Sequence, residues 1–150
     1  MTQTPHVPNR ERPLVTDVEL HQTLEFLLQC ANQRQVWLIM FGEDKCVAGP
    51  LMPMSDYPVD PEELIEADDL GQVTFSHALL VRAGMICAMT GGRELVFVWE
   101  RLGSRDLTPS DVAWARAVVR ESESGEVPSI RAQFVLHDRG LRQLRPDDLV

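Results

Sequence analysis

The sequence has 150 residues, of which 44% are hydrophobic and 25% charged, and this composition excludes an intrinsically disordered chain. A chain of this length forms one domain and buries ~68–70% of the surface that it exposes when unfolded. The formal net charge is −9, so the surface repels the phosphate backbone of a nucleic acid. Arg139, Arg142 and Arg145 come closest to a basic patch, but three aspartates flank them. We therefore expect no nucleic-acid partner.

Cysteine content and apolar runs indicate the compartment. Cys30, Cys46 and Cys87 are odd in number and widely spaced, which argues against a disulfide framework and a zinc knuckle and favours buried thiols. The N-terminus has no apolar signal region, and no run approaches ~18 consecutive apolar residues. We expect a cytoplasmic protein with no membrane partner.

The N-terminal segment divides at about residue 15. Residues 1–14 hold three prolines without hydrophobic periodicity, which predicts a mobile tail followed by a single domain over residues 15–150. Thr16 and Glu19 have the spacing of a capping box, and apolar residues from Val18 to Ala31 recur at helical intervals. This pattern predicts an amphipathic helix.

A hairpin and an acidic segment follow. The apolar run 35–41, a turn at 42–45 and an extended run at 46–52 predict two paired strands, the first covered on both faces. Asp60 and Pro61 resemble a helix start, and we expect a short exposed helix or loop over 60–69. This acidic run is interpreted either as a solvated face or as a docking site for a basic partner.

The rest of the chain alternates helices and strands. Thr74 begins a predicted second helix that ends at Gly91-Gly92, and residues 95–99 form a predicted buried strand. A third helix is predicted from Thr108-Pro109-Ser110-Asp111, and a second hairpin from 130–137 and 141–145. This order favours an α/β fold, a three-layer α/β/α arrangement around a mixed sheet.

Three segments resemble the JAB/MPN superfamily of zinc hydrolases, and most closely its RadC-like branch, over about residues 35–149. They are Val47-Ala48-Gly49, the strand-loop-helix unit 94–111 and the segment 134–140. The resemblance implies the cytidine-deaminase-like architecture of that superfamily. It also implies a strand that ends in His-x-His, followed by Ser and Asp, with a Glu on an earlier strand as general base. Three protein ligands there hold zinc and leave a fourth position for water.

The metal ligands of that family are missing from this chain. Ser110 stands at the Ser position, but the His pair falls on Glu100 and Leu102 or, with a loop one residue longer, on Trp99 and Arg101. Ala113 replaces the Asp, and residues 46–52 contain no acid. The vestigial site therefore comprises Trp99, Glu100, Arg101, Ser110 and Ala113.

The residues at the vestigial site disfavour a metal. A guanidinium at Arg101, ~4 Å from a dication, repels it by roughly 8 kcal/mol at an effective dielectric constant of ~20. Asp111 is interpreted as a helix cap rather than a displaced ligand. The four histidines are scattered, without a metal-binding pair. We expect no metal and no cofactor.

We therefore expect a catalytically inactive JAB/MPN-like domain, a protein-binding or scaffold module whose partner is another protein or a second copy. Trp99 and Trp114 are interpreted as core residues or, alternatively, as an aromatic anchor around the former metal cleft. The predicted contact residues are Trp99, Glu100, Arg101, Arg105, Glu62, Glu63 and Glu66. Two alternatives stay open, which are a metal-independent hydrolase that uses Glu100 and Ser110 and a small-molecule sensor that uses the vestigial pocket.

Overall fold

A mixed five-stranded sheet forms the centre of the computed structural model, which describes residues 12–124 and 127–150. Its strands lie in the order β2 (Val47–Ser55), β1 (Gln35–Phe41), β5 (Glu94–Glu100), β6 (Ser129–His137) and β7 (Gly140–Gln143). β5 and β6 are parallel, whereas the other neighbours are antiparallel. The predicted α/β class, the mixed sheet and both hairpins are confirmed.

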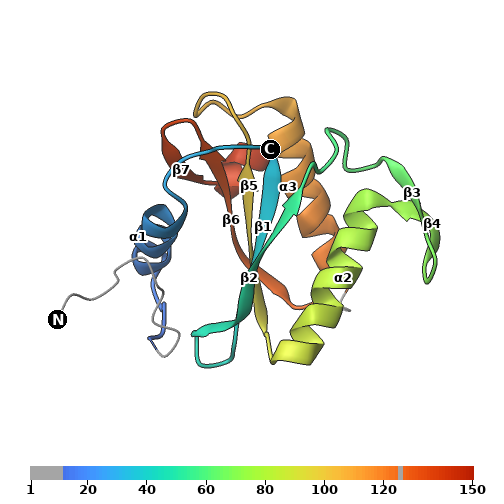
Figure 1. Ribbon diagram of the computed structural model, residues 1–150, viewed down its shortest axis with the longest axis horizontal. Helices are drawn as coiled ribbons and strands as arrows, with labels where there is room; N and C mark the ends of the chain where they lie inside the picture. The colour runs from blue at the N-terminus through green and yellow to red at the C-terminus, as the bar shows by residue number, and fades with distance from the viewer. Residues whose placement is uncertain (1–11, 125–126) are drawn as a thin grey trace.

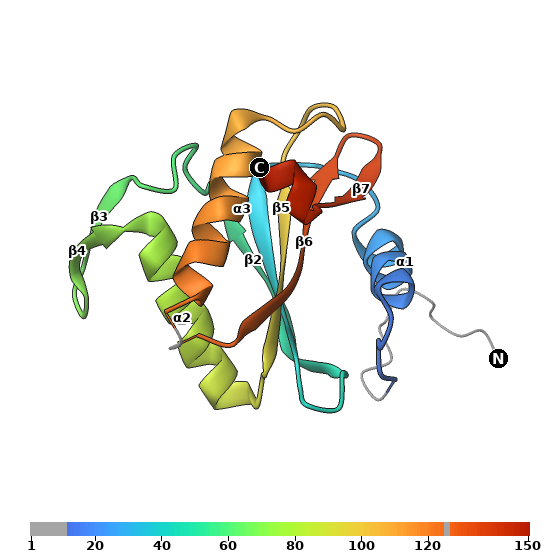
Figure 2. The same cartoon turned by 180° about the vertical axis from the view of Figure 1, so that it is seen from behind.

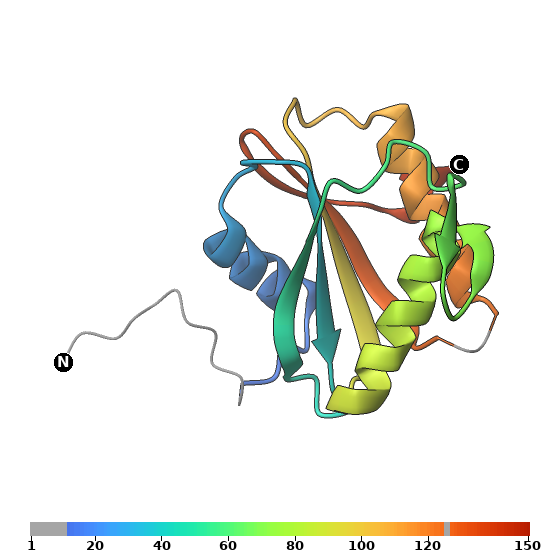
Figure 3. The ribbon, with the colours of Figure 1, turned by 45° about the vertical axis from the view of Figure 1, so that its right-hand side comes forward.

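Helices cover both faces of this sheet. α1 (Asp17–Leu28) lies on one face, and α2 (Phe75–Thr90) and α3 (Pro109–Ser122) lie on the other (Figures 1 and 3). Successive residues of β5 point to opposite faces, so Phe97 and Trp99 enter the core under α2 and α3 while Val96 and Val98 enter the core under α1. This double burial explains why β1 and β5 have continuous apolar sequences.

Local capping signals place the starts of α1 and α3 and the end of α2 where the sequence predicts them, whereas α1 ends at Leu28, before Ala31. The Thr16 and Thr108 side chains accept hydrogen bonds from the backbone N–H groups of Glu19 and Asp111, which complete two capping boxes. α2 ends at Gly91, whose φ of 79° lies in the left-handed region that glycine adopts without strain.

The prediction of a helix or loop over residues 60–69 is wrong. β3 (Leu64–Ala67) and β4 (Gly71–Thr74) form a separate two-stranded hairpin beside α2 (Figure 1). The Asp60 carboxylate does accept the N–H of Glu62, but the turn does not continue as a helix. The carbonyls of Pro61 and Glu63 instead accept the first N–H groups of α2, which have no partner within that helix.

Several side chains differ from the predicted burial. Val18 and Met89, assigned to apolar helix faces, are exposed, as is Cys30, whereas Cys46 and Cys87 are buried. Leu14, assigned to the tail, is buried and donates its N–H to the carbonyl of Lys45. Arg12 and Pro13 are exposed, and residues 1–11 of the predicted tail lie outside the described residues.

The chain also has a C-terminal element that the sequence does not predict. The 3₁₀ turn η1 (Pro146–Leu149) packs against α3, where the Arg116 side chain donates to the carbonyl of Leu149 (Figure 2). Among residues 12–124 and 127–150, no helix combines the length and the apolar character that crossing a bilayer requires.

Candidate functional site

The vestigial site lies where β5 ends and the loop to α3 begins. Trp99 is fully buried, its indole N–H donates to the amide oxygen of Gln133 at 2.9 Å, and its ring lies 5.2 Å from that of Trp114. Trp114 is also fully buried and donates to the carbonyl of Pro58. Both are core residues, so the exposed aromatic anchor and the contact role of Trp99 are wrong.

Arg101 is the next inward-facing side chain, and it is held on all sides. Its Nε and Nη2 atoms donate to the carboxylate of Asp111, with an Nη2–Oδ2 distance of 2.8 Å. Nη1 donates to the carbonyl of Ser104 at 2.6 Å, and Nη2 also donates to that of Asp106 at 2.9 Å. The side chain is only 6% exposed. The guanidinium therefore fixes the loop after β5 and offers no free surface to a partner, against its predicted contact role.

Asp111 joins this loop to α3. Its carboxylate accepts the N–H of Thr108 at 2.9 Å, and its own N–H donates to the Thr108 hydroxyl at 3.1 Å. The negative charge thus lies at the positive end of the α3 dipole while it pairs with Arg101. The predicted cap role of Asp111 is confirmed, and the Arg101–Asp111 pair joins β5 to the start of α3.

Within the described part of the chain, Glu100 accepts its hydrogen bonds from residues before and within β1. They come from the backbone N–H groups of Asn32 and Gln33 and the side chains of Gln35 and Trp37, at 2.7–3.2 Å. Burial opposes ionisation of this carboxyl, but the four donors outweigh it and lower the pKa of Glu100 below its usual value. Glu100 is thus a buried, ionised acceptor, and its predicted contact with a partner is wrong.

Ser110 takes part in a different set of contacts. Its hydroxyl donates to the carbonyl of Val59 at 2.6 Å and accepts from Arg34 at 3.5 Å. Among the described residues, no carboxylate or imidazole bonds to this hydroxyl, so the structure does not join Glu100 and Ser110 as an acid-base pair. Ala113 lies half-buried in the first turns of α3 and supplies no polar atom.

Other potential ligands do not gather either. No group of three or more His, Cys, Asp or Glu residues within 12–124 and 127–150 has a geometry that could hold a metal. His137 lies near the vestigial site, but burial and the charges of Arg101 and Arg105 lower its pKa. His77 pairs with Glu121 on the helical layer, at 2.6 Å.

The remaining predicted contact residues are on the surface. Glu62, Glu63 and Glu66 are exposed on or beside the β3–β4 hairpin, and Arg105 is exposed on the loop before α3. Glu62 forms an ion pair with Arg120 at 2.6 Å, whereas Glu63 and Glu66 form no ion pair with any described residue. The hairpin acids and Arg105 are therefore accessible, as a contact role requires.

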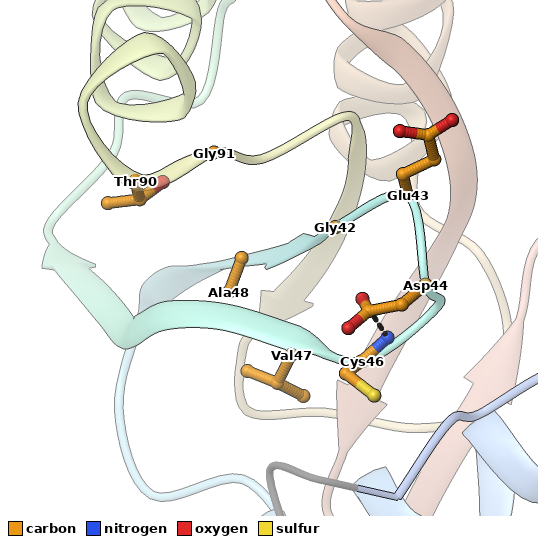
Figure 4. Close-up of a pocket in the computed structure, with 8 residues that line it drawn as sticks. All are labelled: Gly42, Glu43, Asp44, Cys46, Val47, Ala48, Thr90 and Gly91. Atoms are coloured by element: carbon orange, nitrogen blue, oxygen red, sulfur yellow. Dashed lines mark hydrogen bonds between the residues drawn. The ribbon is translucent and has the colours of Figure 1, made fainter.

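Two surface clefts were not predicted from the sequence. One, of about 460 Å³, lies between the β1–β2 turn and the end of α2, where the Asp44 carboxylate turns back to accept the N–H of Cys46 at 3.1 Å (Figure 4). The other, of about 300 Å³, is lined by Arg105, Arg142 and Arg145 together with His21. The sequence signal for the second cleft is the arginine cluster at 139–145, which flanking aspartates obscured.

Comparisons with protein-family models, with curated proteins and with solved structures gave no match to this chain.

Proposed function

We propose that this chain is a metal-free, catalytically inactive JAB/MPN-like (RadC-like) domain that acts as a protein-binding or scaffold module. The observation that carries the proposal is the buried Arg101–Asp111 pair. The pair fills the junction of β5 and α3 with the Arg101 guanidinium and the Asp111 carboxylate that caps α3. A metal cation bound there would be repelled by the positive charge of Arg101. Glu100 and Ser110, the groups that a metal-free hydrolysis would use, are bonded to separate partners.

The β3–β4 hairpin is the surface best suited to contact a partner. Exposed Leu64 and Val59 add apolar area beside the acids Glu63 and Glu66, a combination found where an apolar centre has a charged rim. β3 and β4 pair only with each other among the described residues, so each keeps one free edge. A basic partner matches this surface, because opposite charge speeds association and selects among partners.

Charge reversal on the hairpin tests this proposal. The Glu63→Lys/Glu66→Lys variant is compared with wild type in cross-linking capture from an extract of the source cell, and self-association is followed by sedimentation across protein concentrations. We expect wild type to recover a basic protein or a second copy in a salt-sensitive way. The hairpin variant should recover at least about 10-fold less.

A matched variant separates the surface from the net charge. Glu43→Lys/Glu123→Lys makes the same change at two exposed acids outside the hairpin and should bind as wild type does. Equal recovery by the hairpin variant would reject this surface. A strictly monomeric protein that recovers no partner, or purified protein that holds one zinc per chain between Trp99 and Ser110, would reject the function itself.

A further inference from the structure

A basic cleft lies on the side of the sheet where α1 meets β7. Figure 1 shows these two elements as neighbours, and the cleft opens between α1, the loop after β5 and the segment from β7 to η1. Its ionisable lining is Arg105, Arg142, Arg145, His21 and Asp148. A smaller cleft of about 210 Å³ shares His21, Gln143 and Arg145 with it and adds Asp17, so the combined hollow extends along α1.

Two of the three guanidiniums are free to bind. The side chains of Arg105 and Arg145 are exposed and form no hydrogen bond or ion pair with any residue in 12–124 or 127–150. Arg142 is half-buried and donates to the carbonyl of Arg105 and to the carboxylate of Asp148, each at 3.1 Å. Arg142 thus holds the backbone of Arg105 beside its own side chain.

The scaffold of the cleft keeps these groups together. Arg101 binds the carbonyls on both sides of Arg105, those of Ser104 and Asp106, and so fixes the loop that carries it. Asp148 accepts the N–H of Arg145 at 2.8 Å and thereby holds the start of η1 next to β7. A site whose backbone is already fixed loses little conformational entropy when a ligand binds.

The local charge is opposite in sign to that of the whole chain. Three guanidiniums against one carboxylate leave two net positive charges in the lining, on a chain whose formal net charge is −9. Burial lowers the pKa of His137, and the positive charges of Arg101 and Arg105 lower it further, while the negative charge of Asp138 acts in the opposite direction. Neighbouring guanidiniums repel each other, and a bound anion would offset this repulsion.

We infer that this cleft binds the phosphate group of a small soluble phosphate monoester through Arg105, Arg142 and Arg145. The planar guanidinium forms paired hydrogen bonds with phosphate oxygens, and a phosphate dianion matches the two net charges of the lining. A volume of about 300 Å³ lies at the lower end of the range for small-molecule sites, so the ligand is small. A long polyanion is disfavoured because the rest of the surface is acidic. This site is separate from the hairpin surface proposed above.

Titration with inorganic phosphate, followed by calorimetry at constant ionic strength, tests the inference. Wild type should saturate at one site per chain, and glycerol phosphate should compete for it. In the Arg105→Gln/Arg145→Gln variant the affinity should fall at least about 10-fold for each guanidinium lost, as charge-assisted hydrogen bonds predict. Neither side chain forms a hydrogen bond or ion pair with a described residue, so the variant should unfold at nearly the same urea concentration as wild type without phosphate.

The matched control is Arg93→Gln/Arg139→Gln. It removes the same charge from two exposed arginines outside the lining and should leave the phosphate affinity within about 2-fold of wild type. Three results would overturn the inference: no saturable phosphate binding by wild type, an equal loss of affinity in the control variant, or tighter binding of a single-stranded oligonucleotide than of phosphate at the same arginines.

Discussion

Replacing Arg101 by Met gives the sharpest test of the interpretation of the vestigial site. Met keeps much of the apolar stem but removes five hydrogen bonds, three to the Asp111 carboxylate and one each to the carbonyls of Ser104 and Asp106. Among the described residues, the Asp111 carboxylate, 3% exposed, would then accept a hydrogen bond from the N–H of Thr108 alone and would remain a buried charge without its counterion. Removal of one partner of such a pair costs about 3–5 kcal/mol, which is a large part of a typical domain's stability.

Urea denaturation, followed by the fluorescence of buried Trp99 and Trp114, measures this loss. The midpoint should fall while the slope of free energy against urea stays constant, because the surface exposed on unfolding is unchanged. Arg105→Met is the matched control on the same loop, since that side chain is exposed and unpaired, and should change stability by less than about 0.5 kcal/mol. A loss of less than about 1 kcal/mol in the free energy of unfolding of Arg101→Met would refute the role of Arg101 in fixing the loop after β5.

Two further predictions concern Glu100 and Gly91. Glu100→Gln should lower the free energy of unfolding by about 3 kcal/mol at neutral pH, because the four donors lose their charged acceptor. Because the pKa of Glu100 is lower in the folded than in the unfolded state, its stabilisation of the fold is fully present above the unfolded-state pKa and is lost as the pH falls through the folded-state pKa. The difference in unfolding free energy between wild type and variant, measured by urea titration, should therefore narrow below about pH 4. A difference that stays constant with pH would contradict the assignment of Glu100 as an ionised acceptor. Gly91→Ala should lower the free energy of unfolding, measured by thermal unfolding, by about 1 kcal/mol through its left-handed φ alone, since an added Cβ meets no atom within 4 Å. Gly91→Asn should cost less. Equal stability of Gly91→Ala and wild type would contradict the left-handed end of α2 at Gly91.

Elements whose signals lie within a few residues are predictable from the sequence. The two capping boxes, Thr16 with Glu19 and Thr108 with Asp111, each consist of reciprocal hydrogen bonds between residues three positions apart. The sequence pattern alone therefore locates the starts of these helices. β5 is recognisable because both of its faces are buried. The β3–β4 hairpin is not, since its strands have four residues each and the acids around them dominate the composition.

The candidate site could not be predicted because its contacts join residues far apart in the chain. The donors to Glu100 lie 63–68 residues before it, and Arg101 meets Asp111 across a loop of irregular backbone. Neither spacing has a periodicity that a sequence pattern can reveal. Glu100 and Arg101, which stand where the resemblance places metal ligands, therefore serve in the folded chain as a hydrogen-bond acceptor for the start of β1 and as the donor that holds the loop after β5.

The two proposed surfaces rest on different charges, so one can fail without the other. On the hairpin side, Glu62 and Asp69 form ion pairs with Arg120 and Arg82, whereas Glu63, Glu66 and Asp68 form no ion pair with a described residue. On the cleft side, Arg142 pairs with Asp148, whereas the guanidiniums of Arg105 and Arg145 form no ion pair with a described residue. Two groups of unpaired charge, of opposite sign, thus lie on separate elements. Unpaired charge of one sign, held on a fixed backbone, is the property that a binding surface requires and that a purely structural face does not.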